Sequence, residues 1–161
     1  MALVNFYRGL REPTDLLNFA RQKRMSEFRF YLYANCGNDI LPENVVGKGR
    51  VDRDAFRMVV SHSSAAIVIG NKTSVKYRSS KFYEYLSCRV PIIGIGNDEE
   101  MSYYAKYPFF LDSQDNELVQ KLEHFQQKDL LSFNPYKIFP ERDPEKIMSD
   151  VLAKVTSEPN T

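Results

Sequence analysis

The sequence contains little cysteine and no excess of charge of one sign. Its two cysteines, Cys36 and Cys88, lack CxxC spacing and companion histidines, which argues against a zinc site and against a disulfide framework. The 22 basic residues stand against 21 acidic ones, so the formal net charge is +1. This balance provides no general field for binding nucleic acid or an anionic bilayer. We therefore expect no nucleic-acid partner, and any anion-binding site must be local.

Long apolar runs are also missing. Residues 1–10 include Asn5, Tyr7 and Arg8, so they lack the apolar stretch of a signal peptide. No other run approaches the length of a membrane span. Together with the scattered cysteines, which suit a reducing compartment, these features favour a cytoplasmic protein.

No repeat, low-complexity tract or flexible linker interrupts the chain, and a hydrophobic content of 43% suffices for one core of ordinary size. We expect a single domain over residues 1–161. Short apolar runs alternate with longer amphipathic ones, which is typical of βαβ units that form a parallel sheet. The predicted class is therefore α/β, with about six strands flanked by helices.

The individual elements follow from apolar periodicity, turn residues and capping residues. The predicted strands are Leu3–Tyr7, Phe28–Tyr33, Val45–Val51, Ala65–Ile69, Ile92–Ile95 and Phe109–Leu111. One helix is predicted to begin near Pro13, and the others span Arg53–Ser61 after the N-cap Asp52, Ser80–Cys88, Glu99–Lys106, Asn116–Gln127 and Pro144–Val155. The stretch Leu131–Asp143 is rich in proline and aromatic residues and is predicted to cross the surface as an ordered loop.

The helix predicted to begin at Ser80 presents a polar face. Offsets of three and four residues return to the same side of a helix, so Ser80, Lys81 and Glu84 are neighbours. The opposite side carries apolar residues that can pack against the sheet: Phe82, Tyr85 and Leu86. Free N–H groups at the helix start, with a serine and a lysine, suit a phosphate. The Glu84 carboxylate could accept hydrogen bonds from two adjacent hydroxyls, as on ribose.

These residues alone leave a purely structural alternative open. In that interpretation Ser80 caps the helix, Lys81 is solvated, and Glu84 pairs with Lys81 or Arg89 at the surface.

The neighbourhood favours a ligand site. In doubly wound sheets, ligands bind beyond the carboxyl ends of the strands. Asn71 follows the fourth predicted strand, and Gly9 and Arg11 follow the first, so all three are expected at that edge. Taken singly, Gly9 could be a turn glycine and Arg11 an exposed charge; beside the Ser80 helix they become candidate ligand contacts.

Several segments carry a resemblance to a known family: residues 6–13 (FYRGLREP), 49–51 (GRV), 67–71 (IVIGN), and 79–86 (SSKFYEYL) followed by 90–93 (VPII). The last pair looks like the motif "PSKxxEY…PII". The chain resembles, over nearly its whole length, the C-terminal nucleotide-sugar-binding half of GT-B glycosyltransferases, especially the bacterial enzymes that build capsular and other surface polysaccharides.

The resemblance implies a Rossmann-like, doubly wound parallel sheet that holds a nucleoside diphosphate as the leaving group. Glu84 would bind the ribose hydroxyls, Ser80 and Lys81 would lie near the diphosphate, and Arg11 would assist with its charge. The segment Gly49–Val51, with Arg50 and Val51, would contact the base. The acceptor hydroxyl would attack the anomeric carbon directly, so neither a metal nor another cofactor is expected, and catalytic residues stay unassigned.

The resemblance also implies a second part. The chain begins at the first strand of the donor half, so an N-terminal acceptor-binding domain is expected as a partner, without which turnover is not expected. The full-length enzyme could associate peripherally with the inner face of the membrane. Two positions depart from the family pattern: Lys76 replaces a sugar-contacting glutamate, and Ser79 replaces the proline of "PSK".

Two other classes of function stay open. One is a flavodoxin-like or receiver-like module that binds a phosphate-bearing ligand without catalysis, although a receiver needs an acidic cluster where this chain has Arg8 and Arg11. The other is an interaction domain without a small ligand. His62 and His124 are isolated, and we expect structural roles for both.

The aromatic cluster near residue 105 can be interpreted as a stacking surface, but core or interface packing is favoured. Its members are Tyr103, Tyr104, Tyr107, Phe109 and Phe110.

Overall fold

The structure, a computed structural model, describes residues 2–4, 13–34, 41–70, 79–96 and 98–157 and confirms the α/β class. The described strands pair in parallel in the order β3-β2-β1-β4-β5-β6. They are β1 (Ala2–Val4), β2 (Phe30–Tyr33), β3 (Val45–Gly47), β4 (Ala66–Ile69), β5 (Ile92–Ile95) and β6 (Phe110–Asp112). Within the part of β1 that the structure describes, the halves β3-β2-β1 and β4-β5-β6 join through one register pair, Ala2 with Ala66.

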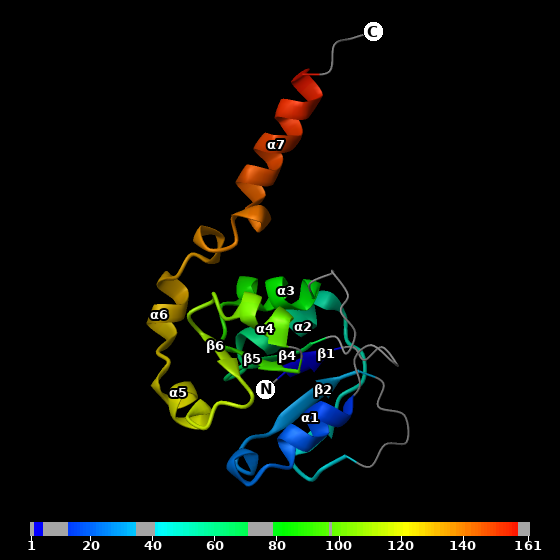
Figure 1. The fold of residues 1–161 in the computed structure, drawn as a ribbon. Coiled ribbons are helices and arrows are strands. Elements are labelled where there is room, and N and C mark those ends of the chain that lie inside the picture. Colours follow the sequence, from blue (N-terminus) through cyan, green and yellow to red (C-terminus); the bar gives the residue numbers. More distant parts are fainter. Residues whose placement is uncertain (1, 5–12, 35–40, 71–78, 97, 158–161) are drawn as a thin grey trace.

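Helices cover both faces of the sheet (Figure 1). The described α-helices are α1 (Pro13–Ala20), α2 (Arg53–Ser61), α3 (Ser80–Cys88), α4 (Asp98–Tyr104), α5 (Leu118–His124), α6 (Gln127–Ser132) and α7 (Pro144–Ser157). Helix α1 lies on one side, and α2, α3 and α4 lie on the other. Short 3-10 helices span Lys23–Met25, Pro135–Lys137 and Pro140–Arg142.

The two central strands are buried on both faces, as expected for a sheet between helical layers. Every residue of β4 and β5 is buried. On one face, Ile67 and Ile93 pack with Leu16 of α1 and Leu118 of α5. The residues that point to the other face pack with α2, α3 and α4.

The aromatic residues near position 105 belong to this second core layer. Tyr104 and Tyr107 are buried, and the ring of Tyr104 stacks on that of Phe82 with centroids 3.8 Å apart. Tyr103, Phe109 and Phe110 are partly buried against the same layer. Core packing is therefore confirmed for the cluster, and the stacking-surface interpretation is wrong.

Two predicted elements require correction. The strand predicted over Val45–Val51 ends at Gly47, and Gly49 has a φ of 69°, a left-handed conformation incompatible with extended backbone. The helix predicted over Asn116–Gln127 is shorter: α5 spans Leu118–His124, the backbone is extended at Phe125 and Gln126, and a separate helix, α6, begins at Gln127. The Phe125 ring packs edge-on against Phe109, with centroids 5.3 Å apart, and this contact favours the break.

Other boundaries shift by a few residues. The first strand is described at Ala2–Val4, and residues 5–7 of its predicted span lie outside the described residues. The stretch predicted as an ordered loop, Leu131–Asp143, contains the end of α6 and two 3-10 helices. In Figure 1, α7 extends away from the sheet. None of the helices in the described ranges is long and apolar enough to cross a membrane.

Candidate functional site

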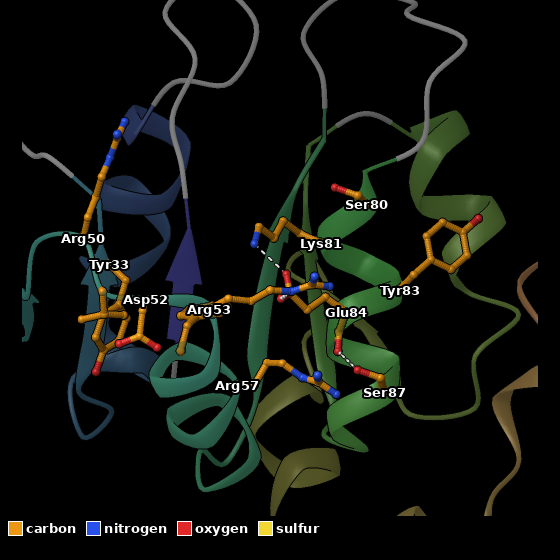
Figure 2. A pocket seen from close by; sticks show the side chains of 12 residues that line it. Tyr33, Arg50, Asp52, Arg53, Arg57, Ser80, Lys81, Tyr83, Glu84 and Ser87 are labelled. Atoms are coloured by element: carbon orange, nitrogen blue, oxygen red, sulfur yellow. Dashed lines mark hydrogen bonds and ion pairs between the residues drawn. The ribbon is translucent and has the colours of Figure 1, made fainter. Parts of the chain in front are cut away.

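A pocket with a volume of about 840 Å³ lies between α2 and α3 (Figure 2). Its walls come from the last residue of β2, Tyr33, and from the segments that follow β3 and β4. The lining residues are Tyr33, Arg50, Val51, Asp52, Arg53, Phe56, Arg57, Ser80, Lys81, Tyr83, Glu84 and Ser87.

Helix α3 supplies the polar wall because its other face is held by the core. Phe82, Tyr85 and Leu86 are buried, as predicted. With that face fixed against the sheet, Lys81 and Glu84 point toward α2 in Figure 2. The sequence pattern therefore predicted the orientation of this helix correctly.

The start of α3 is held from outside the helix. Ser79, not Ser80, is the N-cap residue, and its side chain makes no capping hydrogen bond. The Ser79 N–H instead donates to Glu100 Oε1 at 3.1 Å and to the Tyr104 hydroxyl at 2.8 Å. The alternative in which Ser80 caps the helix is thus wrong. Ser80 and Lys81 are the first two residues of α3, where backbone amides have no acceptor within the helix.

The tyrosine that holds Ser79 is fixed in its protonated form. Burial raises the pKa of the Tyr104 hydroxyl, and its hydrogen bond to Glu100 raises this pKa further. The hydroxyl can therefore accept from Ser79 and donate to Glu100 at the same time. Helix α4 in this way positions the beginning of α3.

The opposite wall is positioned by the cap of α2. The Asp52 carboxylate accepts a hydrogen bond from the Ala55 N–H at 2.8 Å, as expected of an N-cap aspartate. This capping hydrogen bond fixes where the β3–α2 connection enters the helix. Arg50 and Val51 in that connection are both exposed along the pocket.

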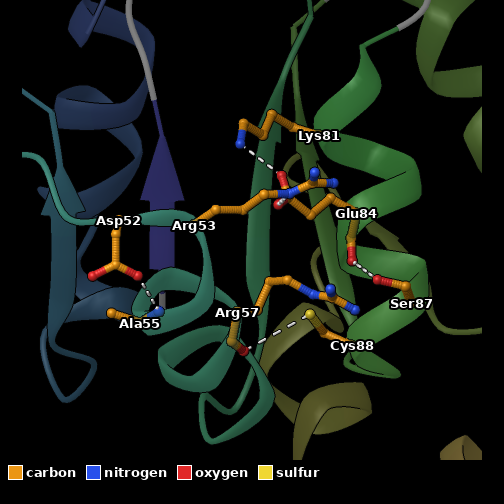
Figure 3. A network of polar contacts seen from close by, with 8 residues as sticks. All are labelled: Asp52, Arg53, Ala55, Arg57, Lys81, Glu84, Ser87 and Cys88. Carbon is orange, nitrogen blue, oxygen red and sulfur yellow. Dashed lines mark hydrogen bonds and ion pairs between the residues drawn. The ribbon is translucent and has the colours of Figure 1, made fainter.

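Glu84 forms ion pairs with two cations of the site (Figure 3). Its Oε2 accepts from Lys81 Nζ at 2.6 Å, and its Oε1 accepts from Arg53 Nε at 3.3 Å. The structural alternative is therefore confirmed for the Glu84–Lys81 pair. It is wrong for Arg89, which donates to the Leu131 carbonyl oxygen.

These cations set the charge state of Glu84. Partial burial alone would raise the pKa of its carboxyl, but the hydrogen bonds and charges of Lys81 and then Arg53 outweigh burial and lower the pKa below its usual value of 4.5. The group is consequently ionised at neutral pH. A carboxylate that is already ionised can accept hydrogen bonds but cannot serve as a proton donor there.

A pH dependence follows from this lowered pKa. Since the folded state binds the Glu84 proton less tightly than the unfolded state, the ion pairs stabilise the fold above pH 4.5 and lose this contribution as the pH falls through the lower folded pKa. Urea denaturation should therefore show a stability gap between the wild type and Glu84→Gln that is widest near pH 7 and shrinks below pH 4.5. For Glu123→Gln, an exposed control on α5, no comparable difference in stability from the wild type is expected. A difference between the wild type and Glu84→Gln that does not change with pH would contradict the stabilisation by the ionised Glu84.

Positive charge predominates in the pocket. Four cationic side chains line it against the carboxylates of Asp52 and Glu84. The Lys81 ammonium also lies 5.2 Å from the centroid of the Phe56 ring, a cation–π contact that keeps it at the inner wall. The pocket is therefore suited to an anionic ligand, although the chain as a whole is nearly neutral.

Five of the eight residues singled out from the sequence line this one pocket: Arg50, Val51, Ser80, Lys81 and Glu84. The other three, Gly9, Arg11 and Asn71, lie outside the described residues, as does Lys76.

The sequence prediction missed Arg53 and Arg57. Both come from α2, which was identified from its N-cap Asp52 and its apolar residues, without regard to its basic ones. Their spacing of four residues places them on one face of a helix, three and seven positions after Arg50. That basic spacing was the signal that could have marked α2 as the second wall.

The other titratable groups that the structure describes are scattered over the fold. No group of three or more His, Cys, Asp or Glu side chains that could hold a metal ion occurs within the described ranges. His62 is the C-cap residue of α2, and His124 is the last residue of α5. Burial raises the pKa of the Cys88 thiol, which disfavours its reactive thiolate.

Comparison of the chain with known protein families, with curated proteins and with solved structures finds no match. The pocket itself and the motifs in the sequence are therefore the indications of function.

Proposed function

We propose that this chain is a Rossmann-like donor-binding domain that holds the nucleoside diphosphate part of a nucleotide sugar for glycosyl transfer to a glycan or lipid-linked acceptor. The observation that carries the proposal is the meeting of two distant segments in one pocket: Arg50–Val51, and the polar face formed by Ser80, Lys81 and Glu84. These are the segments to which the resemblance to GT-B glycosyltransferases assigns the base, the diphosphate and the ribose.

The strand order supports this proposal. In sheets of the order 3-2-1-4-5-6, nucleotides bind beyond the carboxyl ends of the strands, where the order reverses. Here the order reverses between β1 and β4. The pocket takes its walls from the segments that follow β3 and β4, and Tyr33 is the last residue of β2.

The size and charge of the pocket fit such a ligand. A volume of about 840 Å³ lies within the usual range of small-molecule sites, roughly 300–1,000 Å³. In the proposed pose the diphosphate lies at the start of α3 beside Ser80 and Lys81, and the ribose lies beside Glu84. The helix dipole and Lys81 then stabilise the negative charge that develops on the diphosphate.

In the proposed reaction, the acceptor oxygen forms a bond to the anomeric carbon as the bond between that carbon and the diphosphate oxygen breaks. The proton of the acceptor hydroxyl passes to a base of the partner acceptor-binding domain. The chain acts in the cytoplasm in this proposal, and any contact with the membrane belongs to the full-length enzyme.

Thermal unfolding with UDP, GDP, CDP, CMP and inorganic phosphate tests the proposal. The matching nucleoside diphosphate at 100 times its dissociation constant should add about 2.7 kcal/mol of apparent stability. Lys81→Met and Glu84→Gln should each remove most of this gain, because each removes a charge-assisted hydrogen bond worth about 1.5–3 kcal/mol.

The matched controls are Lys128→Met and Glu123→Gln, two exposed positions on α6 and α5. Both should keep the full stabilisation. If no nucleoside diphosphate stabilises the wild type, the donor-binding function is rejected. If phosphate alone stabilises it equally well, the chain is a phosphate-binding module without nucleotide recognition.

A further inference from the structure

The engagement of Glu84 limits what the pocket can bind. A ribose presents two adjacent O–H donors, which need acceptor oxygens. Both oxygens of Glu84 already accept from cations, and the side chain is only 9% exposed. Each oxygen could accept a second hydrogen bond, but the carboxylate is nearly buried and its open side is covered by the two cations. A diol must therefore compete with Lys81 and Arg53 for access to it.

The two cations are held with unequal strength. Lys81 lies on the same helix as Glu84, is 27% exposed, makes the shorter contact of 2.6 Å and also contacts the Phe56 ring. Arg53 reaches across from α2, is 79% exposed and makes the longer contact of 3.3 Å. A cation that lies mostly in water is screened by solvent and loses side-chain freedom when it pairs, so its ion pair contributes less than the sheltered Lys81 pair. Arg53 is therefore the cation that a ligand can draw away from Glu84.

Building on the proposed function, we propose that Arg53 makes the pocket selective for nucleoside diphosphates over nucleosides. It does so by an exchange of partners, leaving the Glu84 carboxylate and pairing with the diphosphate of the ligand. A diphosphate at the start of α3 offers the Arg53 guanidinium a bidentate partner of higher charge. When Arg53 pairs with the diphosphate, Lys81 stays on Glu84 Oε2 and the Oε1 side becomes accessible to the ribose hydroxyls. A nucleoside brings no replacement anion, so it must break the Arg53–Glu84 pair without compensation.

The exchange gives Arg53 opposite effects on two ligands that share the same base and ribose. A residue that merely contacted the phosphates would leave nucleoside affinity unchanged. A residue that merely held α2 and α3 together would weaken both ligands when it is lost. Opposite signs are thus specific to the exchange.

Isothermal titration of the wild type, Arg53→Met and Arg21→Met with paired ligands tests this inference. The pairs are UDP with uridine, GDP with guanosine and CDP with cytidine. In Arg53→Met, the diphosphate should bind about tenfold more weakly, because one charge-assisted hydrogen-bond donor is lost. The nucleoside should bind about two- to fivefold more tightly, because an exposed ion pair no longer has to be broken.

Arg21→Met removes an exposed arginine at the end of α1, away from this pocket, and should change neither affinity. If the wild type binds a diphosphate but Arg53→Met weakens both ligands, or leaves the nucleoside unchanged, the exchange is refuted while the proposed function stands. If the wild type binds no nucleoside diphosphate, the proposed function fails and this inference fails with it.

Discussion

Replacing Phe82 with alanine is expected to lower the free energy of unfolding by about 3–5 kcal/mol. The side chain is fully buried, its ring stacks on Tyr104, and its centroid lies 5.5 Å from that of Phe139. Truncation leaves a cavity where α3, α4 and the segment before α7 meet. Urea denaturation followed by circular dichroism measures the loss directly.

Phe82→Leu is the matched control for this prediction. Leucine keeps most of the apolar volume, so its cost should stay below about 1.5 kcal/mol. Equal costs for the two substitutions would show that the ring does not anchor the layer. Because α3 carries Lys81 and Glu84, Phe82→Ala should also weaken nucleotide binding at temperatures where the fold persists.

Gly94→Val should destabilise the protein by about 3 kcal/mol through overpacking. A Cβ placed on Gly94 in β5 would lie 2.3 Å from Met101 Sδ and 2.3 Å from Phe110 Cζ. Neither atom can remain in place, so the Met101 and Phe110 side chains must leave their packed positions. Thermal and urea unfolding of the purified variant measure the cost.

A double-mutant cycle separates this overpacking from a loss of backbone flexibility. Gly94→Ala and Met101→Ala should each destabilise, the first by collision and the second by creating a cavity. Combined, they should cost about 1 kcal/mol less than the sum of the two, since the second substitution removes one of the colliding atoms. Strict additivity would rule out the collision with Met101 as the cause.

The sequence predicted best those elements whose capping residues and apolar periodicity match the face that is buried. Helices Arg53–Ser61 and Ser80–Cys88 were predicted with the boundaries that the structure has. The first has a capping aspartate and apolar periodicity, and the second has a buried face that alternates with a polar one. The strands β4 and β5 were likewise predicted, because strands that are buried on both faces are nearly continuous apolar runs in the sequence.

Features that depend on contacts between distant residues were not predicted. The Arg53–Glu84 ion pair joins positions 31 residues apart, and nothing local in either helix indicates it. The break at Phe125 depends on the Phe109 ring, and the position of Ser79 depends on Tyr104. Local propensity carries no information on such contacts, which form only when the layers assemble.

The unequal exposure of the two cations around Glu84 makes the pocket sensitive to ionic strength. At about 0.15 M salt the Debye length is roughly 8 Å, so dissolved ions screen the Arg53 contact, which lies mostly in water. The Lys81 contact is sheltered by the protein and is screened much less. Added salt therefore weakens the Arg53–Glu84 pair and leaves the Lys81–Glu84 pair in place. High salt should thus partly reproduce the effect of removing the Arg53 side chain.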